Sequence, residues 1–277
     1  MRINRVLRTY FKSFQEYIEH LLLSGSYYEK IPVSVVGVQR SGTTMLLNIL
    51  QHSPECSVYH EGNKEAYDNF RIKPDNKIKR LIKMNKKRII IIKPINDLQY
   101  TDRFLEIHHN AKAVWIYRDY HDVINSAVKK WGEAQKNMML GISKGYIKHP
   151  GQNALSERMT SETLRLVRKI ANEKMSSADG AALLWYIRNL LYFDLNLHEN
   201  RRVLIVKYED LINMSLQRVE RIFNFISCTF NEVYTYEIFT SSVRKTPAPI
   251  INLEIEILCK ELMDRLNEHY LFQRSNF

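Results

Sequence analysis

The stretch VSVVGVQRSGTTMLLNILQHSP, residues 33–54, constrains the fold more than any other part of the sequence. An apolar run is followed by a short loop between Gly37 and Gly42, and then by apolar residues at helical spacing until Pro54. This order predicts a buried strand, a glycine-flanked loop and a helix. Because the first N–H groups of such a helix point at the loop, we expect the loop to bind an anion. A tight strand–helix turn without a ligand is the alternative.

Four further segments have the composition of buried strands. Three of them are nearly continuous apolar runs, which is typical of a parallel sheet covered on both faces. The four segments are CSVYH (56–60), RIIIIK (88–93), KAVWIY (112–117) and RVLIVKY (202–208). Helical patterns cover 43–52, 119–131, 181–199, 211–226 and 252–269, the last with Asn252 as its N-cap. This alternation predicts an α/β, P-loop-like three-layer fold, in which a central parallel sheet of about five strands is flanked by helices.

The 277 residues are predicted to form a single domain. A helix over 1–30 is predicted to pack on this domain, and its binding to a membrane surface is the alternative. Segment 132–180 is polar and basic and has the least regular pattern in the chain. We predict that it forms an insertion or a lid over the carboxyl edge of the sheet.

The composition of the chain indicates which partners and which cellular compartment the protein is suited to. The formal net charge of +11 favours anionic partners without choosing among them. The three cysteines, Cys56, Cys228 and Cys259, form no C-x-x-C motif, so we predict free thiols in a reducing compartment. No apolar run is long enough for an integral membrane segment, and no signal-peptide pattern is present. A cytoplasmic location is therefore predicted.

The loop departs from the P-loop of nucleoside triphosphatases in one position. That motif reads G-x-x-x-x-G-K-[ST], whereas here Thr43 stands at the lysine position and Thr44 at the hydroxyl position. A P-loop enzyme also needs a carboxylate for Mg²⁺ at a strand end, but the strands here end at Lys93 and Arg118. The sequence therefore predicts a multiply charged anion bound without metal.

Three motifs carry a family resemblance. QRSGTT (39–44), RDYHDVINS (118–126) and VKYEDL (206–211) occur in this order and together resemble the sulfotransferases, over about residues 32–260. The resemblance implies that a sulfuryl group is transferred from 3′-phosphoadenosine 5′-phosphosulfate (PAPS) to an acceptor hydroxyl, with no metal. It implies that the first motif binds the 5′-phosphosulfate and that Arg118 and Ser126 bind the 3′-phosphate.

The cofactor-binding residues implied by the resemblance lie in four segments. They are Arg40, Ser41, Gly42, Thr43, Thr44, Arg118, Ser126 and Tyr208, with Arg244 and Lys245, along with Ser241 and Ser242, in TSSVRKTPAP (240–249). Alternatives stay open for three of these assignments. Arg118 could form a surface ion pair with Asp119 or Asp122, Ser126 could be a small packing residue, and 240–249 could be a charged surface loop.

The expected general base depends on the branch of the family that the sequence resembles. The cytosolic phenol and steroid class has a histidine base shortly after a lysine, but KPIND (93–97) contains none, and Arg40 and Met45 also depart from that class. The sequence is more similar to the carbohydrate and protein-tyrosine branch. That similarity implies Glu61 as the base, with Lys93 and Arg40 as further catalytic residues. The alternative bases are His60, Asp97 and Glu65.

The acceptor is left open between a carbohydrate, a small metabolite and a peptidyl-tyrosine. Two other functions are kept as alternatives. One is an atypical P-loop nucleotide kinase, which shares the fold but requires the missing lysine and metal carboxylate. The other is a basic nucleic-acid-binding protein, suggested by the net charge and by NKKR (85–88), although no recognised nucleic-acid-binding module is present.

Overall fold

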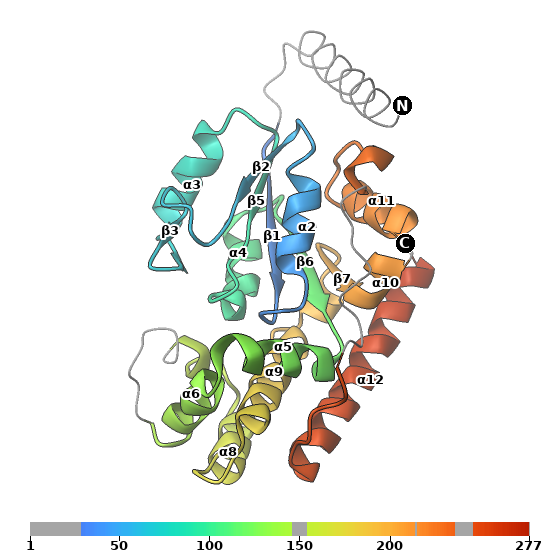
Figure 1. The fold of residues 1–277 in the computed structure, drawn as a ribbon. Coiled ribbons are helices and arrows are strands. Elements are labelled where there is room, and N and C mark those ends of the chain that lie inside the picture. The colour runs from blue at the N-terminus through green and yellow to red at the C-terminus, as the bar shows by residue number, and fades with distance from the viewer. Residues whose placement is uncertain (1–28, 146–153, 214, 236–245, 277) are drawn as a thin grey trace, which may run out of the picture.

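The computed structural model describes residues 29–145, 154–213, 215–235 and 246–276 (Figure 1). Nearly all of the helix predicted over 1–30 lies outside these ranges, so it stays a prediction. The C-terminal candidates Ser241, Ser242, Arg244 and Lys245 lie outside the described residues as well.

Five parallel strands form the central sheet, in the spatial order β2–β5–β1–β6–β7. The strands are β1 Ile31–Gly37, β2 Cys56–Tyr59, β5 Ile89–Ile92, β6 Lys112–Tyr117 and β7 Val203–Lys207. All seven positions of β1 are buried, which explains why its sequence shows no alternation of apolar and polar residues. The prediction of an α/β fold with a five-stranded parallel sheet is confirmed.

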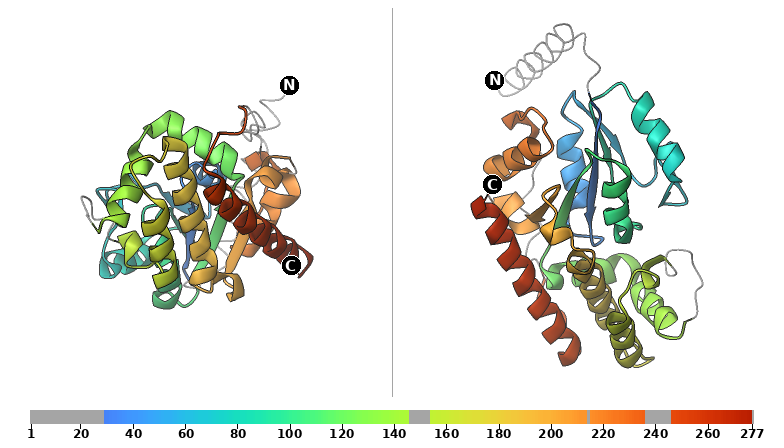
Figure 2. Two further views of the ribbon diagram at one scale, coloured as in Figure 1. Left: turned by 90° about the horizontal axis from the view of Figure 1, so that it is seen from below. Right: turned by 180° about the vertical axis from the view of Figure 1, so that it is seen from behind.

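Helices cover both faces of the sheet, which gives three layers (Figures 1 and 2). On one face, Val33 and Val35 of β1 pack in a core with α2, α10 and α11. On the other face, Val36 packs in a core with α3, α4, α9 and α12. The bounds are α2 Thr43–Leu50, α3 Asp75–Met84, α4 Thr101–Ile107, α9 Ser177–Asp194, α10 Tyr208–Asn213, α11 Ser215–Phe225 and α12 Leu253–Asn276.

The described parts of segment 132–180 are more regular than the sequence indicated. They contain α6 (Ala134–Ser143) and α8 (Ser161–Ile170), whose apolar side chains join the core around α9. Together with α5 (Tyr120–Trp131), these helices lie beyond the carboxyl ends of the strands (Figures 1 and 2). Gly132 directly follows α5, and Gly145 follows α6 after Lys144; both glycines have a positive φ.

Two predicted helix boundaries also change. Helix α9 begins earlier than expected because Ser176 and Asp179 form a capping box, in which each side chain bonds the other residue's backbone N–H. The segment predicted as one helix over 211–226 covers the end of α10, which already begins at Tyr208, and the separate helix α11. Helix α12 has the predicted N-cap, because the Asn252 side chain accepts a hydrogen bond from the N–H of Glu254.

The remaining elements are small. A two-stranded antiparallel hairpin, β3 Tyr67–Asp68 and β4 Arg71–Ile72, follows β2. Three short 3₁₀ helices cover Leu98–Tyr100, Leu197–Glu199 and Glu232–Thr235. Within the described residues, none of the helices has the length and apolar character that crossing a membrane requires. Cys56, Cys228 and Cys259 are all buried free thiols.

Candidate functional site

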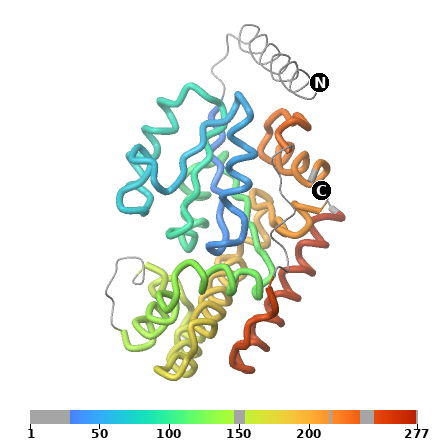
Figure 3. Tube along the Cα trace, viewed as in Figure 1, coloured from blue at the N-terminus to red at the C-terminus, as the bar shows by residue number. Residues whose placement is uncertain are grey.

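The order of the strands indicates which edge of the sheet carries the ligand-binding site. The chain passes from β5 to β6 across β1, so the strand order reverses around β1. Open α/β sheets bind their ligands at such a switch point, beside the carboxyl ends of the strands. Three segments that carry predicted site residues meet there, namely the loop 38–42 after β1, Lys93 after β5 and Arg118 after β6. Figure 3 follows the trace of these segments to the lower edge of the sheet.

The loop after β1 is closely packed on the YEDL segment. Gly42 has a φ of 95°, and a Cβ atom at this position would overlap the ring of Tyr208. Helix α2 starts at Thr43, so its first N–H groups have no partner within the helix. The Oγ atom of Ser41 is buried and has no hydrogen-bond partner among the described residues. These features fit an anion that accepts hydrogen bonds from the loop.

Lys93 joins the loop to the segment after β2. Its Nζ atom lies 2.7 Å from Oε2 of Glu61 and donates a hydrogen bond of 2.8 Å to Oγ1 of Thr44. The lysine side chain is only 5% exposed, whereas the carboxylate of Glu61 is 20% exposed and therefore reachable from solvent. The structure thus brings the predicted base and the predicted catalytic lysine together at the mouth of the loop.

Arg118 forms the ion pair considered from the sequence, but the pair is buried and does not lie on the surface. Its guanidinium does pair with Asp122 at 3.0 Å, but both side chains are less than 10% exposed. The same guanidinium donates to the backbone carbonyl of Arg40 and lies over the ring of Tyr208, 4.4 Å from its centre. These contacts fix a planar cation beside the loop, which suits a phosphate ligand.

Ser126 lies two turns along α5 and also faces the loop. Its Oγ atom accepts a hydrogen bond of 2.8 Å from Nε of Arg40. Arg40 itself is exposed and has a positive φ of 75°. Arg40, Arg118 and Ser126 therefore converge on one small region, as the motif spacing predicted.

Glu209 forms a hydrogen bond with the residue that precedes α5. Its carboxylate accepts a hydrogen bond from the N–H of Asp119, the residue whose side chain caps α5. Burial raises the pKa of Glu209 above its ordinary value, and the backbone hydrogen bonds oppose that shift only in part. Glu209 thus connects the first turn of α10 with the helix that carries Ser126.

Sequence reasoning missed a polar chain behind the loop. Arg188 of α9 is fully buried and donates to the side-chain oxygen of Gln39 and to the carbonyl of Ile95. The Gln39 amide then donates to Asn96 at 3.2 Å. Burial lowers the pKa of Arg188 to about 10, and the charge of Asp97 opposes this shift. An arginine within the mostly apolar stretch AALLWYIRNLLYF (181–193) was the available signal.

The three alternative bases have different surroundings. His60 is neighbour to Glu61, and burial together with the charge of Lys93 lowers its pKa, which favours a neutral imidazole. Asp97 is 3% exposed. Its carboxylate forms an ion pair with Arg71 and accepts a hydrogen bond from the N–H of Ile72. Glu65 is exposed on the following loop. Of the four candidates, Glu61 is the carboxylate that the structure places against both Lys93 and solvent.

A family comparison agrees with this geometry. The model of the sulfotransferase domain matches residues 30–247, which is well over half of the chain. The chain belongs to the sulfotransferase family. No curated protein matches this sulfotransferase at a significant level.

Within the described residues, no group of three or more His, Cys, Asp or Glu side chains is placed to hold a metal ion.

Solved structures are similar to this chain at low sequence identity. The sulfotransferase domain of the Synechococcus PCC 7002 olefin synthase is similar with a TM-score of 0.50 and 15% identity, over 86% of this chain and 96% of that chain. A sulfotransferase domain from the curacin biosynthetic pathway has a TM-score of 0.49 and 14% identity, over 86% and 99%. The mouse sulfotransferase SULT7A1, solved in complex with PAP, has a TM-score of 0.42 and 14% identity, over 82% and 71%.

Proposed function

We propose that this sulfotransferase moves a sulfuryl group from PAPS to an acceptor hydroxyl, with Glu61 as the general base. The observation that carries the proposal is the cluster of Lys93, Glu61 and Thr44 at the mouth of the loop. A cation, a solvent-accessible carboxylate and a hydroxyl at the first turn of α2 are the groups that an in-line transfer between two oxygens requires.

The residues of the loop fit the donor. The buried Oγ of Ser41 and the start of α2 supply hydrogen-bond donors for the phosphosulfate end. Arg118 and Ser126, both of which contact Arg40, form a second polar group that suits the 3′-phosphate. Arg244 and Lys245 stay proposed as further contacts to that phosphate. When bound, PAPS supplies the activated sulfuryl group.

The chain's own residues then have distinct tasks. The carboxylate of Glu61 accepts the proton that the acceptor hydroxyl loses as its oxygen forms the new bond to sulfur. The ammonium of Lys93 neutralises the negative charge that develops on the departing 5′-phosphate oxygen. Because Lys93 is already held by Thr44, little reorganisation is needed when that charge appears. Arg40, within the loop, is proposed to stabilise the same charge.

Calorimetry with 3′-phosphoadenosine 5′-phosphate (PAP), without metal, tests the proposal against ATP with Mg²⁺. We expect micromolar binding of PAP and none of Mg²⁺–ATP, because cations occupy the strand ends where a kinase needs a metal carboxylate. Tight binding of Mg²⁺–ATP and none of PAP would instead support the kinase alternative. If neither nucleotide bound while RNA did, the nucleic-acid-binding alternative would be favoured.

The acceptor class and the cellular location rest on the sequence alone. A carbohydrate, a small metabolite and a peptidyl-tyrosine all stay proposed acceptors, and a cytoplasmic location stays a prediction. We further propose that the chain is a single domain in which α6 and α8, beyond the carboxyl edge of the sheet, border the acceptor. A screen of acceptors with radiolabelled PAPS would identify the class.

A further inference from the structure

A second cleft lies away from the loop, at the amino end of β7. It has a volume of about 480 Å³ and is bordered by α11, by the last turns of α12 and by the start of β7. Four arginines line it, namely Arg201, Arg218, Arg221 and Arg274. Among its described lining residues, a single acidic side chain, that of Glu220, offsets these charges. The cleft is therefore strongly basic.

This cleft is separate from the proposed cofactor site. Its floor includes Val203 at the first position of β7, whereas Tyr208 of the cofactor site follows the last position of that strand. Five residues of extended chain separate the two, which corresponds to roughly 16 Å. Figure 1 shows α11 and the end of α12 beside each other, well above the loop after β1. One ligand of modest size cannot occupy both places.

Buried hydrogen bonds hold the cleft in shape. β7 is an edge strand, and the side chain of Gln273 occupies its free edge by bonding the N–H of Ile205 and the carbonyl of Val203. Gln273 is only 4% exposed. Arg221 of α11 donates a hydrogen bond of 2.8 Å to the Gln273 backbone carbonyl, which ties α11 to α12. The wall that carries Arg221 is thus fixed before any ligand arrives.

Positive charges lie close to one another around Arg221 in this cleft. Burial lowers the pKa of Arg221, and the positive charges of Arg218 and Arg274 lower it further, while Tyr270 opposes the shift. The Nε atom of Arg221 is buried and has no hydrogen-bond partner among the described residues. A bound anion would both neutralise the repulsion and supply the missing acceptor.

We propose that this cleft binds a small molecule that carries two or more phosphate groups. Several arginines around one cleft match the high charge density and the bidentate geometry of phosphates. The volume is that of a small-molecule site. The apolar side chains of Val203, Leu204 and Phe225 on its wall suit a ligand with a short apolar or ring-shaped part. This site does not depend on the proposed transferase activity.

The test uses the full-length chain and pyrophosphate as the probe, measured by calorimetry at low salt. Arg221→Gln and the double variant Arg201→Gln/Arg274→Gln should each weaken pyrophosphate binding at this site by about tenfold or more, because each removes charge-assisted hydrogen bonds. The double variant changes two exposed side chains, so it keeps the test valid if Arg221→Gln fails to fold. Arg165→Gln on α8, which removes an equally exposed surface charge elsewhere, should leave binding unchanged.

Two further comparisons separate the possible outcomes. Arg118→Ala, in the proposed cofactor site, should retain binding of pyrophosphate to the cleft. The proposal is overturned if the cleft variants bind pyrophosphate as tightly as the unchanged protein, or if Arg118→Ala alone abolishes binding. Tighter binding of citrate than of pyrophosphate would exclude a phosphate ligand. Binding of an RNA oligonucleotide that the cleft variants abolish, without binding of pyrophosphate, would show that this surface serves a polymer instead.

Discussion

Lys93 and Glu61 form an ion pair, with 2.7 Å between Nζ and Oε2, although they follow different strands of the sheet. β2 and β5 are parallel neighbours, so the segments after them leave the sheet side by side. The lysine is nearly buried and the carboxylate is partly open to solvent. This arrangement leaves Glu61 as the member of the pair that an acceptor can reach, while Lys93 stays directed at the loop.

Replacing Glu61 by glutamine should abolish sulfuryl transfer and preserve binding of PAP. Glutamine keeps the size of the side chain but cannot take a proton, and loss of a general base costs about 10²–10⁴-fold in rate. Lys93 keeps its hydrogen bond to Thr44, so the loop should retain its shape. Turnover with PAPS and calorimetry with PAP measure the two effects separately.

Glu65→Gln is the matched control, because Glu65 is an exposed carboxylate on the same loop. This variant should transfer sulfuryl groups at the rate of the unchanged protein. Full activity of Glu61→Gln would rule out Glu61 as the base, and a large loss in Glu65→Gln would move the assignment to that residue.

Replacing Arg118 by lysine should weaken binding of PAP more than binding of adenosine 5′-monophosphate. Lysine keeps one charge but lacks the planar guanidinium that contacts Asp122, Arg40 and Tyr208. Loss of a charge-assisted hydrogen bond costs about 1.5–3 kcal/mol, or roughly 10- to 100-fold in affinity. Because the monophosphate lacks the 3′-phosphate, it is the internal control. An equal loss for both nucleotides would show that Arg118 does not bind the 3′-phosphate.

Gln39 and Arg188 should behave as a coupled pair. Gln39→Ala leaves a buried guanidinium without one of its acceptors, which costs about 1–3 kcal/mol of unfolding free energy. Arg188→Met removes the charge itself, so the double variant should be more stable than the sum of the two single losses predicts. Denaturant unfolding of the four proteins gives the coupling energy. Strict additivity would mean that this hydrogen bond contributes nothing to stability.

The same pair provides a test of positioning. Gln39 directly precedes Arg40, so loss of its contacts should also lower the affinity for PAP, even though neither side chain is proposed to touch the ligand. Unchanged affinity in a destabilised Gln39→Ala variant would limit the network to a structural role.

The strands and the site at their carboxyl ends could be predicted from the sequence because both depend on local patterns. Buried parallel strands are read as unbroken apolar runs, and β1, β5, β6 and β7 occurred where such runs stand. The segment of β2 is less apolar, and its pattern was correspondingly weaker. Arg118 and Ser126 lie eight positions apart on a strand end and the next helix, so their approach to one region follows from helical geometry. Glu61 required the family resemblance as well, since a carboxylate in a loop has no pattern of its own.

What could not be predicted depends on contacts between distant segments. The polar chain from Arg188 through Gln39 to Asn96 joins three segments that only the folded chain brings together. The hairpin of β3 and β4 has two residues in each strand, too few for a detectable alternation. The basic cleft combines arginines from α11, α12 and the turn before β7, which are scattered in the sequence.

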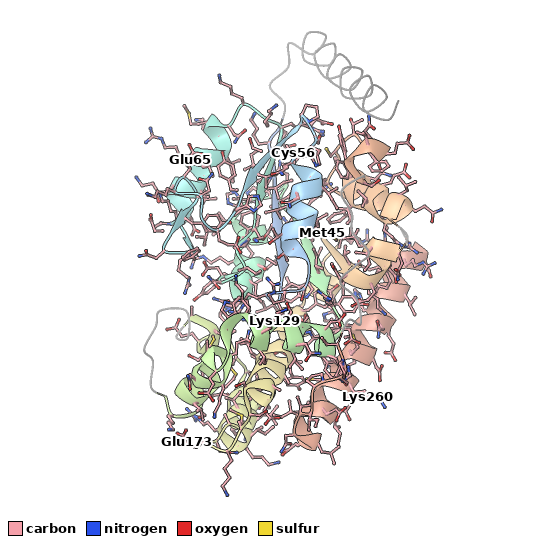
Figure 4. The ribbon with its side chains drawn as sticks, viewed as in Figure 1. Met45, Cys56, Glu65, Lys129, Glu173 and Lys260 are labelled. Atoms are coloured by element: carbon pink, nitrogen blue, oxygen red, sulfur yellow. The ribbon has the colours of Figure 1, made fainter. Side chains whose placement is uncertain are left out.

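The three cysteines should be unreactive in the folded protein and reactive after unfolding. Burial raises the pKa of Cys259, and the hydrogen bond with Cys56 together with burial raises the pKa of Cys228. Since the thiolate is the reactive form, a thiol reagent should label none of them at neutral pH. In guanidinium chloride the same reagent should label all three. Figure 4 shows Cys56 at the edge of the sheet opposite Lys129, so rapid labelling of Cys56 in the native protein would indicate opening at that edge.

Replacing Gly42 by alanine should damage both stability and cofactor binding. The new Cβ atom would overlap the ring of Tyr208, and the φ of 95° is one that alanine rarely adopts. Relief of the overlap requires Tyr208 to move away from the guanidinium of Arg118, which now lies over its ring. We expect a loss of about 1–3 kcal/mol in unfolding free energy, together with weaker binding of PAP.

Gly62→Ala is the matched control for this substitution. Gly62 lies in the loop beside Glu61, its φ is not positive, and a Cβ atom there would meet nothing within 4 Å. Alanine at this position should therefore leave both the unfolding free energy and the affinity for PAP unchanged. If Gly42→Ala were as stable as Gly62→Ala and bound PAP equally well, the close packing of the loop on Tyr208 would not be needed to hold the cofactor. A loss confined to Gly42→Ala would instead tie the conformation of the phosphate loop to the ring that supports Arg118.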